Sequence, residues 1–437
     1  MSKNILVIGS GAREHAIVKA LDRSSHPINI FCLASNMNPG IASLCSETLI
    51  TNFNKTDVVL SYAIEKKISM AIIGPENPLE NGLADVLCDS NIKVIGPKKH
   101  LAQIETSKAF ARDLLKKHNI PGGPKYKIFQ SLKGVKKILK ELGDNYVIKY
   151  DGLAGGKGVK VSGDHLHSND DALQYCKELI TKKNQFVIEE KFIGQEFSLM
   201  SFCDGTVLKH MPAVQDHKRA YVNDKGPNTG GMGTYSDTNH SLPFLEKEDI
   251  RQAHEINKAT AQALKHEFKE EYKGILYGGF MATKEGVKLI EYNARFGDPE
   301  AMNVLSILET DFMDICEAIT MGNLDKVDVS FKKKATVCKY AVPEGYPENP
   351  VKNKKIDVSK IKNKENLFYA SVDIKDGRLV EAGSRTIAFV GIDNTIKQAE
   401  KIAEDEISKI TGPLFHRKDI GTSKLIRKRI NQMKEIR

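Results

Sequence analysis

The sequence predicts a multidomain protein that combines α/β and α+β folds. Three observations indicate this class. Buried-strand runs alternate with helical spacing over the N-terminal quarter, a glycine-rich loop joins two strands in the middle, and lysine-rich, strand-like runs begin at about Asp328. A chain of 437 residues is too long for one ordinary core. We therefore place domains at 1–104, 105–327 and 328–437.

The composition argues against nucleic-acid binding and against insertion into a membrane. The net charge of +9 suits small anionic substrates, although solvated lysine-rich faces account for most of it. The sequence has no aromatic-interleaved basic motif and no zinc-finger spacing. Its seven cysteines form no CxxC pair, and its apolar runs fall short of the ~20 residues of a membrane span. We expect a cytoplasmic monomer that binds neither nucleic acid nor membrane.

The first domain opens on an anion-binding pattern. The strand run Asn4–Ile8 leads into a turn with Gly9 and Gly11, and helical spacing follows. A strand, a glycine turn and a helix N-terminus together bind anions. Repetition of this alternation predicts a doubly wound parallel sheet. Glu14 replaces the third glycine of a dinucleotide fingerprint, so we interpret the turn as a phosphate or sugar site.

Other strand ends of this domain are also polar. Asn36–Gly40 and Gly74–Leu79 follow the second and a later strand. Ligands of open parallel sheets bind beyond the carboxyl ends of the strands. Glu76 is therefore a candidate for recognising a hydroxyl or amine, and a plain turn residue is the alternative interpretation.

The second domain contains a glycine loop of a particular kind. A helix predicted from Thr106 to His118 ends at a Pro/Gly cluster, and further on the loop Asp151–Gly158 lies between two strands. A Walker loop leads into a helix, so this one is better interpreted as a flap whose backbone N–H groups and Lys157 face phosphates. A flexible hairpin is the alternative. Lys149, in an apolar strand, is a second phosphate candidate that requires a partner.

Two polar segments follow. The strand ending at Glu189 and Glu190 is followed by Glu196 at the start of the next strand, as in hinges that hold adenine by backbone groups and ribose by a carboxylate. Most exposed Glu pairs have no such role. The loop Gln215–Tyr235 is polar and glycine-rich, and such a loop inside a compact domain is usually functional or disordered.

The stretch Leu289–Glu300 is the predicted centre of the site. Glu291 and Asn293 lie two residues apart on a strand and share one face. A carboxylate and an amide oxygen suit a hard divalent cation that also binds phosphate. Arg295, next on that face, is placed to steady a transferring phosphoryl group. Mutual pairing of these side chains is the alternative.

Taken together, these segments occur in the order of the ATP-grasp ligases. Over nearly its whole length the chain resembles the phosphoribosylamine–glycine ligase (glycinamide ribonucleotide synthetase) family. The motifs that carry the resemblance are GxGxREHA (9–16), GPExPL (74–79), SKAF (107–110), KxDGLAxGKGV (149–159), QDHKR (215–219), GPNTGGMG (226–233), NxRFGDPE (293–300) and RKDIG (417–421).

The resemblance implies ligation of glycine to 5-phosphoribosylamine with ATP, through glycyl phosphate, in the second step of de novo purine synthesis. It also implies the ligand sets. Glu291 and Asn293 would hold Mg²⁺ or Mn²⁺. ATP would bind Lys108, Lys149, Asp151, Gly155, Gly156, Lys157, Gly158, Glu189, Glu190, Phe192 and Glu196. Phosphoribosylamine would bind Gly9, Gly11, Arg13 and Glu76. Glycine and the transferred phosphate would bind Asp216, Lys218, Arg295 and Asp298, with Arg295, Lys157 and Asp216 as the catalytic groups.

For the fold, the resemblance implies a central ATP-grasp fold of two lobes, with the smaller flap lobe at about 125–189. A small C-terminal α+β domain would pack on the ATP site, with the turn 383–385 near the nucleotide cleft. Two departures stand out: Gly155 replaces a common alanine in the flap, and the loop 181–185 is shorter than in relatives. The alternatives are another ATP-grasp carboxylate–amine ligase of purine metabolism, or a non-catalytic nucleotide-binding protein.

Overall fold

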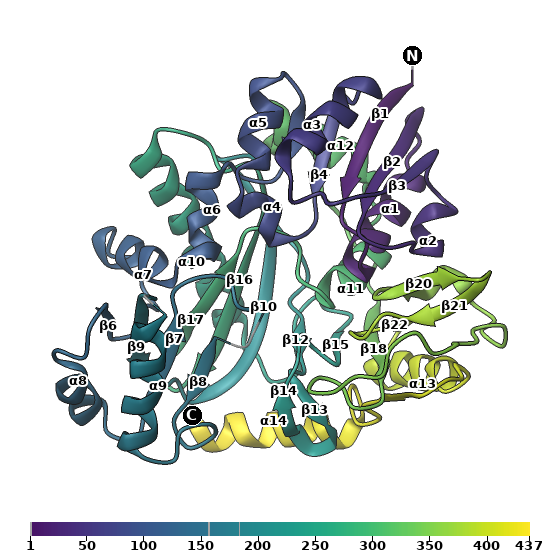
Figure 1. Cartoon of the computed structure of the whole chain (residues 1–437). Coiled ribbons are helices and arrows are strands. Elements are labelled where there is room, and N and C mark those ends of the chain that lie inside the picture. Colours follow the sequence, from purple (N-terminus) through teal and green to yellow (C-terminus); the bar gives the residue numbers. More distant parts are fainter. Residues whose placement is uncertain (1, 156–157, 183) are drawn as a thin grey trace.

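The computed structural model describes residues 2–155, 158–182 and 184–437. The N-terminal parallel sheet lies at one end of the molecule, and the long antiparallel strands β10, β16 and β17 run through its middle (Figure 1). The strands β6–β9 form a separate lobe on one side, and the C-terminal strands and α13 lie on the other (Figure 1). This is the predicted combination of α/β and α+β parts.

The N-terminal sheet is parallel, as predicted, with strand order β3-β2-β1-β4-β5. Its apolar strands β1 and β4 are almost entirely buried, which is typical of a sheet covered by helices on both faces. The strands are β1 (Lys3–Ile8), β2 (Ile28–Ala34), β3 (Glu47–Ile50), β4 (Met70–Ile73) and β5 (Lys93–Ile95). The helices are α1 (Ala12–Asp22), α2 (Pro39–Ala42), α3 (Thr56–Glu65), α4 (Glu76–Glu80), α5 (Leu83–Asp89) and α6 (Lys99–Thr106).

The helix predicted from Thr106 to His118 begins two residues later. Thr106 is the last residue of α6, and α7 spans Lys108–Lys117. Ser107 between them has extended backbone angles, and its hydroxyl accepts a hydrogen bond from the Phe110 N–H. A serine N-cap of this kind ends one helix and starts the next.

The smaller lobe has a core of its own. Its sheet has the order β6-β9-β7-β8, and α8 and α9 cover one face. Apolar side chains on that face, such as Ile148 and Ile188, form a cluster separate from the core shared by the rest of the chain. The elements are β6 (Tyr126–Phe129), α8 (Val135–Leu142), β7 (Tyr146–Tyr150), β8 (Val159–Val161), α9 (Asn169–Thr181) and β9 (Phe186–Glu190).

The larger lobe is built on an antiparallel sheet of order β11-β10-β16-β17, against which α10 packs. Strands β16 and β17 pair as an antiparallel hairpin. The elements are β10 (Gly194–Cys203), β11 (Leu208–His210), β12 (Gln215–Asp216), β13 (Arg219–Tyr221), β14 (Lys225–Asn228), β15 (Gly233–Ser236), α10 (Lys247–Phe268), β16 (Gly274–Thr283), β17 (Gly286–Asn293), α11 (Glu300–Ser306) and α12 (Phe312–Met321).

The third predicted domain shares a sheet with the second. Strand β18 pairs with β15 of the polar loop and with β22, giving the order β12-β15-β18-β22-β19. The C-terminal strands therefore hold one end of the loop 215–235. The elements are β18 (Ala335–Pro343), β19 (Leu367–Tyr369), β20 (Val372–Lys375), β21 (Arg378–Glu381), β22 (Ile387–Asp393), α13 (Ile396–Ile407), β23 (Leu414–His416) and α14 (Ser423–Ile436).

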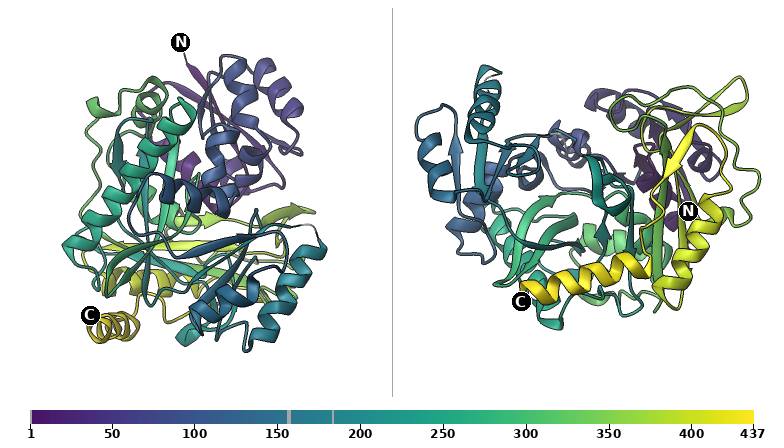
Figure 2. Two further views of the ribbon diagram at one scale, coloured as in Figure 1. Left: turned by 90° about the vertical axis from the view of Figure 1, so that its left-hand side faces the viewer. Right: turned by 90° about the horizontal axis from the view of Figure 1, so that it is seen from below.

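The basic C-terminal segment folds as helix α14. It runs from the C-terminal domain across the molecule toward the smaller lobe (Figure 2) and contacts β10. Met433 is buried, and Arg429 and Arg437 form ion pairs with Asp224 and Asp249. Part of the positive charge of this segment is therefore neutralised within the chain.

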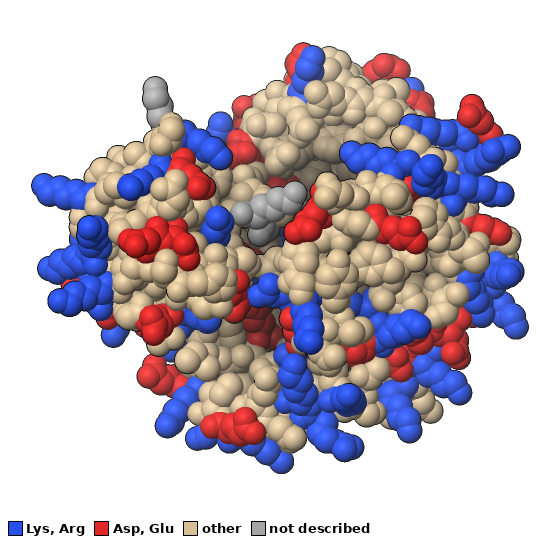
Figure 3. Space-filling model, turned by 60° about the horizontal axis from the view of Figure 1, so that its bottom comes forward, with Lys and Arg blue, Asp and Glu red and all other residues tan. Residues whose placement is uncertain are grey.

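The surface charge is mixed. On the face shown in Figure 3, Lys and Arg side chains are spread widely and interspersed with Asp and Glu around a central hollow. Among the described residues, no helix combines the length and apolar character needed to cross a bilayer.

Candidate active site

The predicted metal ligands lie on β17 beside a bulge. Glu291 faces Gly279 and Asn293 faces Tyr277 on β16, whereas Ile290 is left without a partner in this register. Glu291 lines a hollow with Glu196, Asp216 and Lys218. Within the described residues, neither the Glu291 carboxylate nor the Asn293 amide forms a side-chain hydrogen bond. The side-chain oxygen atoms of both residues therefore accept no hydrogen bond from the described residues and can bind a ligand.

The Glu291 carboxylate lies in a strongly positive environment. Burial by itself would raise its pKa, but the nearby charges of Lys218, Lys149, Lys108 and Arg295 lower the pKa below its usual value. Glu291 is therefore ionised at neutral pH. An ionised carboxylate surrounded by cationic side chains provides binding partners for a divalent cation and for phosphate oxygens together.

Lys149 has the partner that its apolar strand requires. The side chain is buried, forms an ion pair with Glu189, and donates a hydrogen bond of 2.9 Å to the main-chain oxygen of Ile290 in the bulge. Arg112 of α7 binds the same two groups, with its Nε 2.7 Å from Glu189 Oε2. This cluster links the smaller lobe, α7 and the metal-ligand strand.

The beginning of the flap contacts helix α7. Asp151 caps α7, because its carboxylate accepts hydrogen bonds from Ser107 Oγ, the Ala109 N–H and Gln185 Nε2 at 2.7–3.1 Å. Lys108 Nζ lies 3.2 Å from the main-chain oxygen of Gly152. Asp151 thus has a structural role, as an acid at a helix N-terminus, that the sequence analysis did not assign.

The structure describes two of the predicted flap glycines, Gly155 and Gly158. Gly155 has a φ of +53°, a conformation that glycine adopts at little cost. A Cβ on Gly158 would lie 2.8 Å from the Ala154 Cβ, so this position requires glycine. Gly156 and Lys157 lie outside the described residues, and their predicted phosphate contacts stay predictions.

The predicted nucleoside residues do not form one group. Glu189 is buried in the cluster with Lys149. Glu190 accepts a hydrogen bond from the Lys125 N–H and lines a different hollow from Glu291, together with the segment Pro121–Pro124. Glu196 lies in the same hollow as Glu291, 3.1 Å from Lys218 Nζ. Phe192, in the connection between β9 and β10, is half-buried. Of the three carboxylates, Glu196 is therefore the one that shares a hollow with Glu291.

Asp216 and Lys218 line the same hollow. Burial, reinforced by the charge of Glu300, raises the pKa of Asp216 well above its usual value. The Asp216 carboxylate accepts a 2.7 Å hydrogen bond from the His217 N–H. Glu196 raises the pKa of Lys218, so this amine stays protonated. The hollow thus combines a fixed cation with an acid whose ionisation is unfavourable.

Asp298 connects three parts of the chain. Its Oδ1 accepts a 2.7 Å hydrogen bond from Tyr340 Oη of β18 and lies 3.1 Å from Arg385 Nη1. Arg385 also donates to the main-chain oxygens of Gly230 and Asp298, at 2.7 and 2.9 Å. The sequence placed the turn 383–385 near the cleft, but it carried no signal for these contacts, since Arg385 is distant in sequence from all its partners.

The glycine turn of the N-terminal domain packs around Glu14. A Cβ on Gly9 or Gly74 would lie within 2.7 Å of the Glu14 side chain, so the packing of Glu14 requires glycine at both positions. Arg13 is buried and binds Glu14 Oε1 at 2.6 Å. A Cβ on Gly11 would lie 3.8 Å from Asp298. The predicted phosphoribosylamine turn therefore adjoins the stretch that follows β17.

Glu76 and Arg295 complete the junction between these two regions. Arg295 Nε lies 3.4 Å from Glu76 Oε2, and its Nη2 lies 2.9 Å from Glu105 Oε1. The predicted phosphoryl-binding arginine is therefore held between two carboxylates of the N-terminal part of the chain, and Glu76 is brought next to the metal-ligand strand.

Two lobes built on antiparallel sheets, with a glycine loop in the smaller lobe and a carboxylate–amide pair on β17 of the larger one, identify an ATP-grasp enzyme. Comparison with known families and proteins then identifies the group within this class. Phosphoribosylglycinamide synthetase domain families match as the N domain over residues 3–105, the ATP-grasp (A) domain over 106–301 and the C domain over 336–423. The chain belongs to the phosphoribosylamine–glycine ligase family, as the sequence motifs predicted.

Relatives match over almost their whole length. Phosphoribosylamine–glycine ligases of Methanosarcina barkeri and Methanococcus vannielii are 50% and 51% identical to this chain, each covering 99% of both chains. The crystal structure of the Thermotoga maritima ligase is 27% identical, with a TM-score of 0.82 over 95% of this chain and 99% of that one. A biotin carboxylase domain from Hydrogenobacter thermophilus, 16% identical with a TM-score of 0.71 over 99% and 94%, shares the fold.

Proposed function

We propose that this protein ligates glycine to 5-phosphoribosylamine at the expense of ATP, giving glycinamide ribonucleotide, ADP and phosphate. The observation that carries the proposal is the position of the ionised Glu291. It lies among the charges of Lys218, Lys149, Lys108 and Arg295, and Arg295 joins its strand to Glu76 of the N-terminal domain. The proposed nucleotide and metal site would thus adjoin the proposed sugar-phosphate site.

The chemistry requires activation of a carboxylate. Oxide is a poor leaving group, so an amine does not displace it directly from glycine. Transfer of the terminal phosphoryl group of ATP to a glycine carboxylate oxygen gives glycyl phosphate and releases ADP. The amine nitrogen of phosphoribosylamine then attacks the carbonyl carbon, the C–O bond to phosphate breaks, and the amine loses a proton. Catalysis depends on positioning and on neutralising phosphoryl charge.

The donor set fits a hard divalent cation. Glu291 and Asn293 supply a carboxylate and an amide oxygen, which Mg²⁺ accepts together with phosphate oxygens. Mg²⁺ or Mn²⁺ held there would neutralise phosphoryl charge. Lys108, Lys149, Lys157 and Arg295 would bind the phosphates, and Glu196 would bind the ribose while the backbone from Glu189 to Phe192 binds the base.

The remaining residues would serve the other two substrates. Asp216, Lys218 and Asp298 would surround glycine. Gly9, Gly11 and Glu76 would hold phosphoribosylamine, with Arg13 supporting the turn through its contact with Glu14. The cellular setting belongs to the same proposal: a cytoplasmic monomer that acts on small molecules and uses no nucleic acid or membrane.

Coupled ADP release tests the proposal when each substrate is omitted in turn. We expect ADP release to require both glycine and phosphoribosylamine, and glycinamide ribonucleotide to accumulate in step with it. Release that follows another amino acid or acid would indicate a different ATP-grasp ligase. Binding of ATP without turnover in any mixture would indicate a non-catalytic protein.

A further inference from the structure

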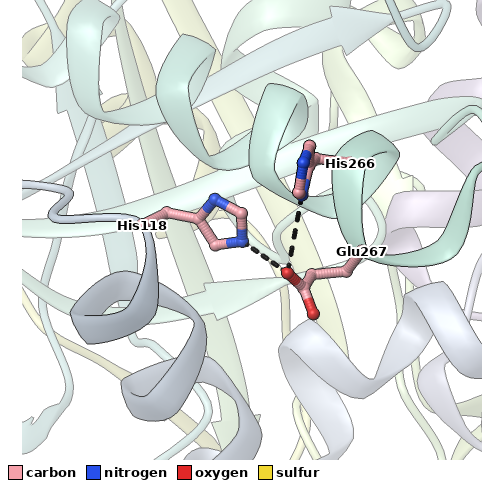
Figure 4. Close-up of side chains that lie close together, drawn as sticks. All are labelled: His118, His266 and Glu267. Carbon is pink, nitrogen blue, oxygen red and sulfur yellow. Dashed lines mark hydrogen bonds and ion pairs between the residues drawn. The ribbon is translucent and has the colours of Figure 1, made fainter.

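A group of metal-binding side chains lies away from the candidate active site. His118 is the C-terminal cap residue of α7, and His266 and Glu267 lie in the last turn of α10. Both imidazoles point toward the same carboxylate of Glu267 (Figure 4). A rise of 1.5 Å per residue puts His118 roughly 15 Å along α7 from Lys108, the end that faces the flap.

The atoms are close enough to share one ion. Nε2 of His118 lies 2.7 Å from Oε1 of Glu267, and Nδ1 of His266 lies 3.7 Å from the same oxygen. One ligand atom from each residue lies within 4.8 Å of the others. The two rings are nearly perpendicular, at 75°, with centroids 5.3 Å apart. An ion ~2.0–2.1 Å from each donor keeps any two donors within about 4.2 Å of each other, so side-chain rotation would have to draw the three atoms together.

The three side chains differ in their freedom to adjust. The His118 and Glu267 side chains are each 19% exposed, whereas that of His266 is 70% exposed. His266 can therefore reorient without disturbing the packing between α7 and α10. His118 and Glu267 are therefore held in place by packing, and His266 is the side chain that can rotate toward them.

We propose that His118, His266 and Glu267 form a binding site for a borderline divalent cation such as Zn²⁺. Two imidazole nitrogens and one carboxylate oxygen are a ligand set that Zn²⁺ uses with a fourth, open position for water. Hard cations such as Mg²⁺ prefer oxygen donors, so this site and the one at Glu291 select different ions. The ion would join the C-terminal ends of α7 and α10.

Lys117 sets a limit on the affinity. Its Nζ lies 2.6 Å from Oε2 of Glu267, so a positive charge already neutralises part of the carboxylate. Oε1 is the oxygen that faces both imidazoles, and an ion bound there would replace its hydrogen bond with His118 Nε2. Replacing Lys117 by methionine removes the competing charge and should strengthen Zn²⁺ binding.

The same region of the chain supplies a matched control. His100 Nε2 lies 2.8 Å from Oε2 of Glu270, and Lys98 Nζ lies 2.6 Å from Oε1 of the same residue. This group repeats the Lys, His and Glu of the proposed site, but among the described residues it has no second imidazole within reach. His100→Ala should therefore leave Zn²⁺ binding unchanged.

Calorimetric titration of the chelator-treated full-length protein with Zn²⁺ tests the proposal, with excess Mg²⁺ present to fill oxygen-only sites. We expect one Zn²⁺ per chain. His118→Ala and His266→Ala should each weaken binding at least about tenfold, since even outer-shell partners of metal ligands contribute 10–100-fold. Binding that is unaffected by either variant, or lost equally in His100→Ala, would overturn the assignment, as would the absence of Zn²⁺ binding.

A second readout separates metal binding from damage to the fold. Zn²⁺ that binds the native protein raises its unfolding temperature by mass action. We expect the wild type and His100→Ala to gain stability with Zn²⁺, and His266→Ala to unfold at the wild-type temperature without Zn²⁺ and to gain nothing with it. Stabilisation of His266→Ala equal to that of the wild type would contradict the proposed site.

Discussion

Arg295 Nη2 lies 2.9 Å from Glu105 Oε1, and Oε2 of the same carboxylate accepts a 2.7 Å hydrogen bond from the Ala294 N–H. Glu105, at the end of α6, therefore fixes both the side chain of Arg295 and the backbone just before it. Because Arg295 also pairs with Glu76, the metal-ligand strand and the N-terminal domain are held in one arrangement.

Glu291→Gln should lower turnover by about 10²-fold or more, on the scale of losing one preorganised charge-stabilising group. The substitution keeps the shape of the side chain and removes the charge that a metal requires. Steady-state ADP release at saturating Mg²⁺ measures the effect, and an unchanged unfolding temperature shows that the fold is retained. Near-normal turnover would remove Glu291 from the site.

Glu76→Ala should raise the Michaelis constant for phosphoribosylamine and leave ATP affinity unchanged. Glu76 belongs to the N-terminal domain, where the sugar phosphate is expected to bind, whereas the nucleotide is expected between the lobes. Kinetics with varied phosphoribosylamine and a separate nucleotide titration distinguish the two constants. A weakened ATP affinity would show that the pair with Arg295 also supports the nucleotide site.

The same pair predicts a pH dependence of stability. The Arg295 guanidinium lowers the pKa of Glu76 to about 2, compared with about 4.3 in an unfolded chain. A depressed carboxyl pKa stabilises the fold fully above pH ~4.3, and this contribution is lost as the pH falls toward 2. The difference in unfolding free energy between the wild type and Glu76→Gln should therefore shrink from pH 5 to about pH 3. A difference that stays constant over this range would contradict the pairing.

Glu189→Gln should destabilise the protein by about 3–5 kcal/mol, because it leaves the buried charges of Arg112 and Lys149 without their anion. Urea unfolding followed by circular dichroism measures the loss. Glu190→Gln is the matched control, since its half-buried carboxylate accepts a hydrogen bond from the Lys125 N–H and should cost about 1 kcal/mol. Equal effects of the two variants would argue against the buried cluster.

Arg385→Ala should lower kcat by up to about 10²-fold, the scale of a 1 Å misplacement of a reacting group. Arg385 orders Gly230 and Asp298 through hydrogen bonds to their main-chain oxygens, and alanine releases both. Arg378→Ala, at an exposed position of β21, is the control and should have wild-type kinetics. If Arg385→Ala also had wild-type kinetics, its contacts would matter only for packing.

Much of the fold was predictable because strand and helix periods are local. The first strand, expected at Asn4–Ile8, spans Lys3–Ile8, and the parallel order of the N-terminal sheet follows from strand–helix alternation. The break at Ser107 was missed because one hydroxyl cap decides it. The pairing of β18 with β15 was also missed, since it joins segments far apart in sequence.

The sequence by itself determined the fold class, the family and the chemistry-bearing residue types, because motifs and hydrophobic periods are written in neighbouring residues. The tertiary structure decided which of those side chains already have partners within the protein. Asp151 caps a helix, Glu189 lies in a buried ion cluster and Arg295 pairs with two carboxylates. Glu291 and Asn293, by contrast, form no side-chain hydrogen bonds in the described part of the chain. These pairings join residues that are far apart in sequence, so they form only when the chain is folded.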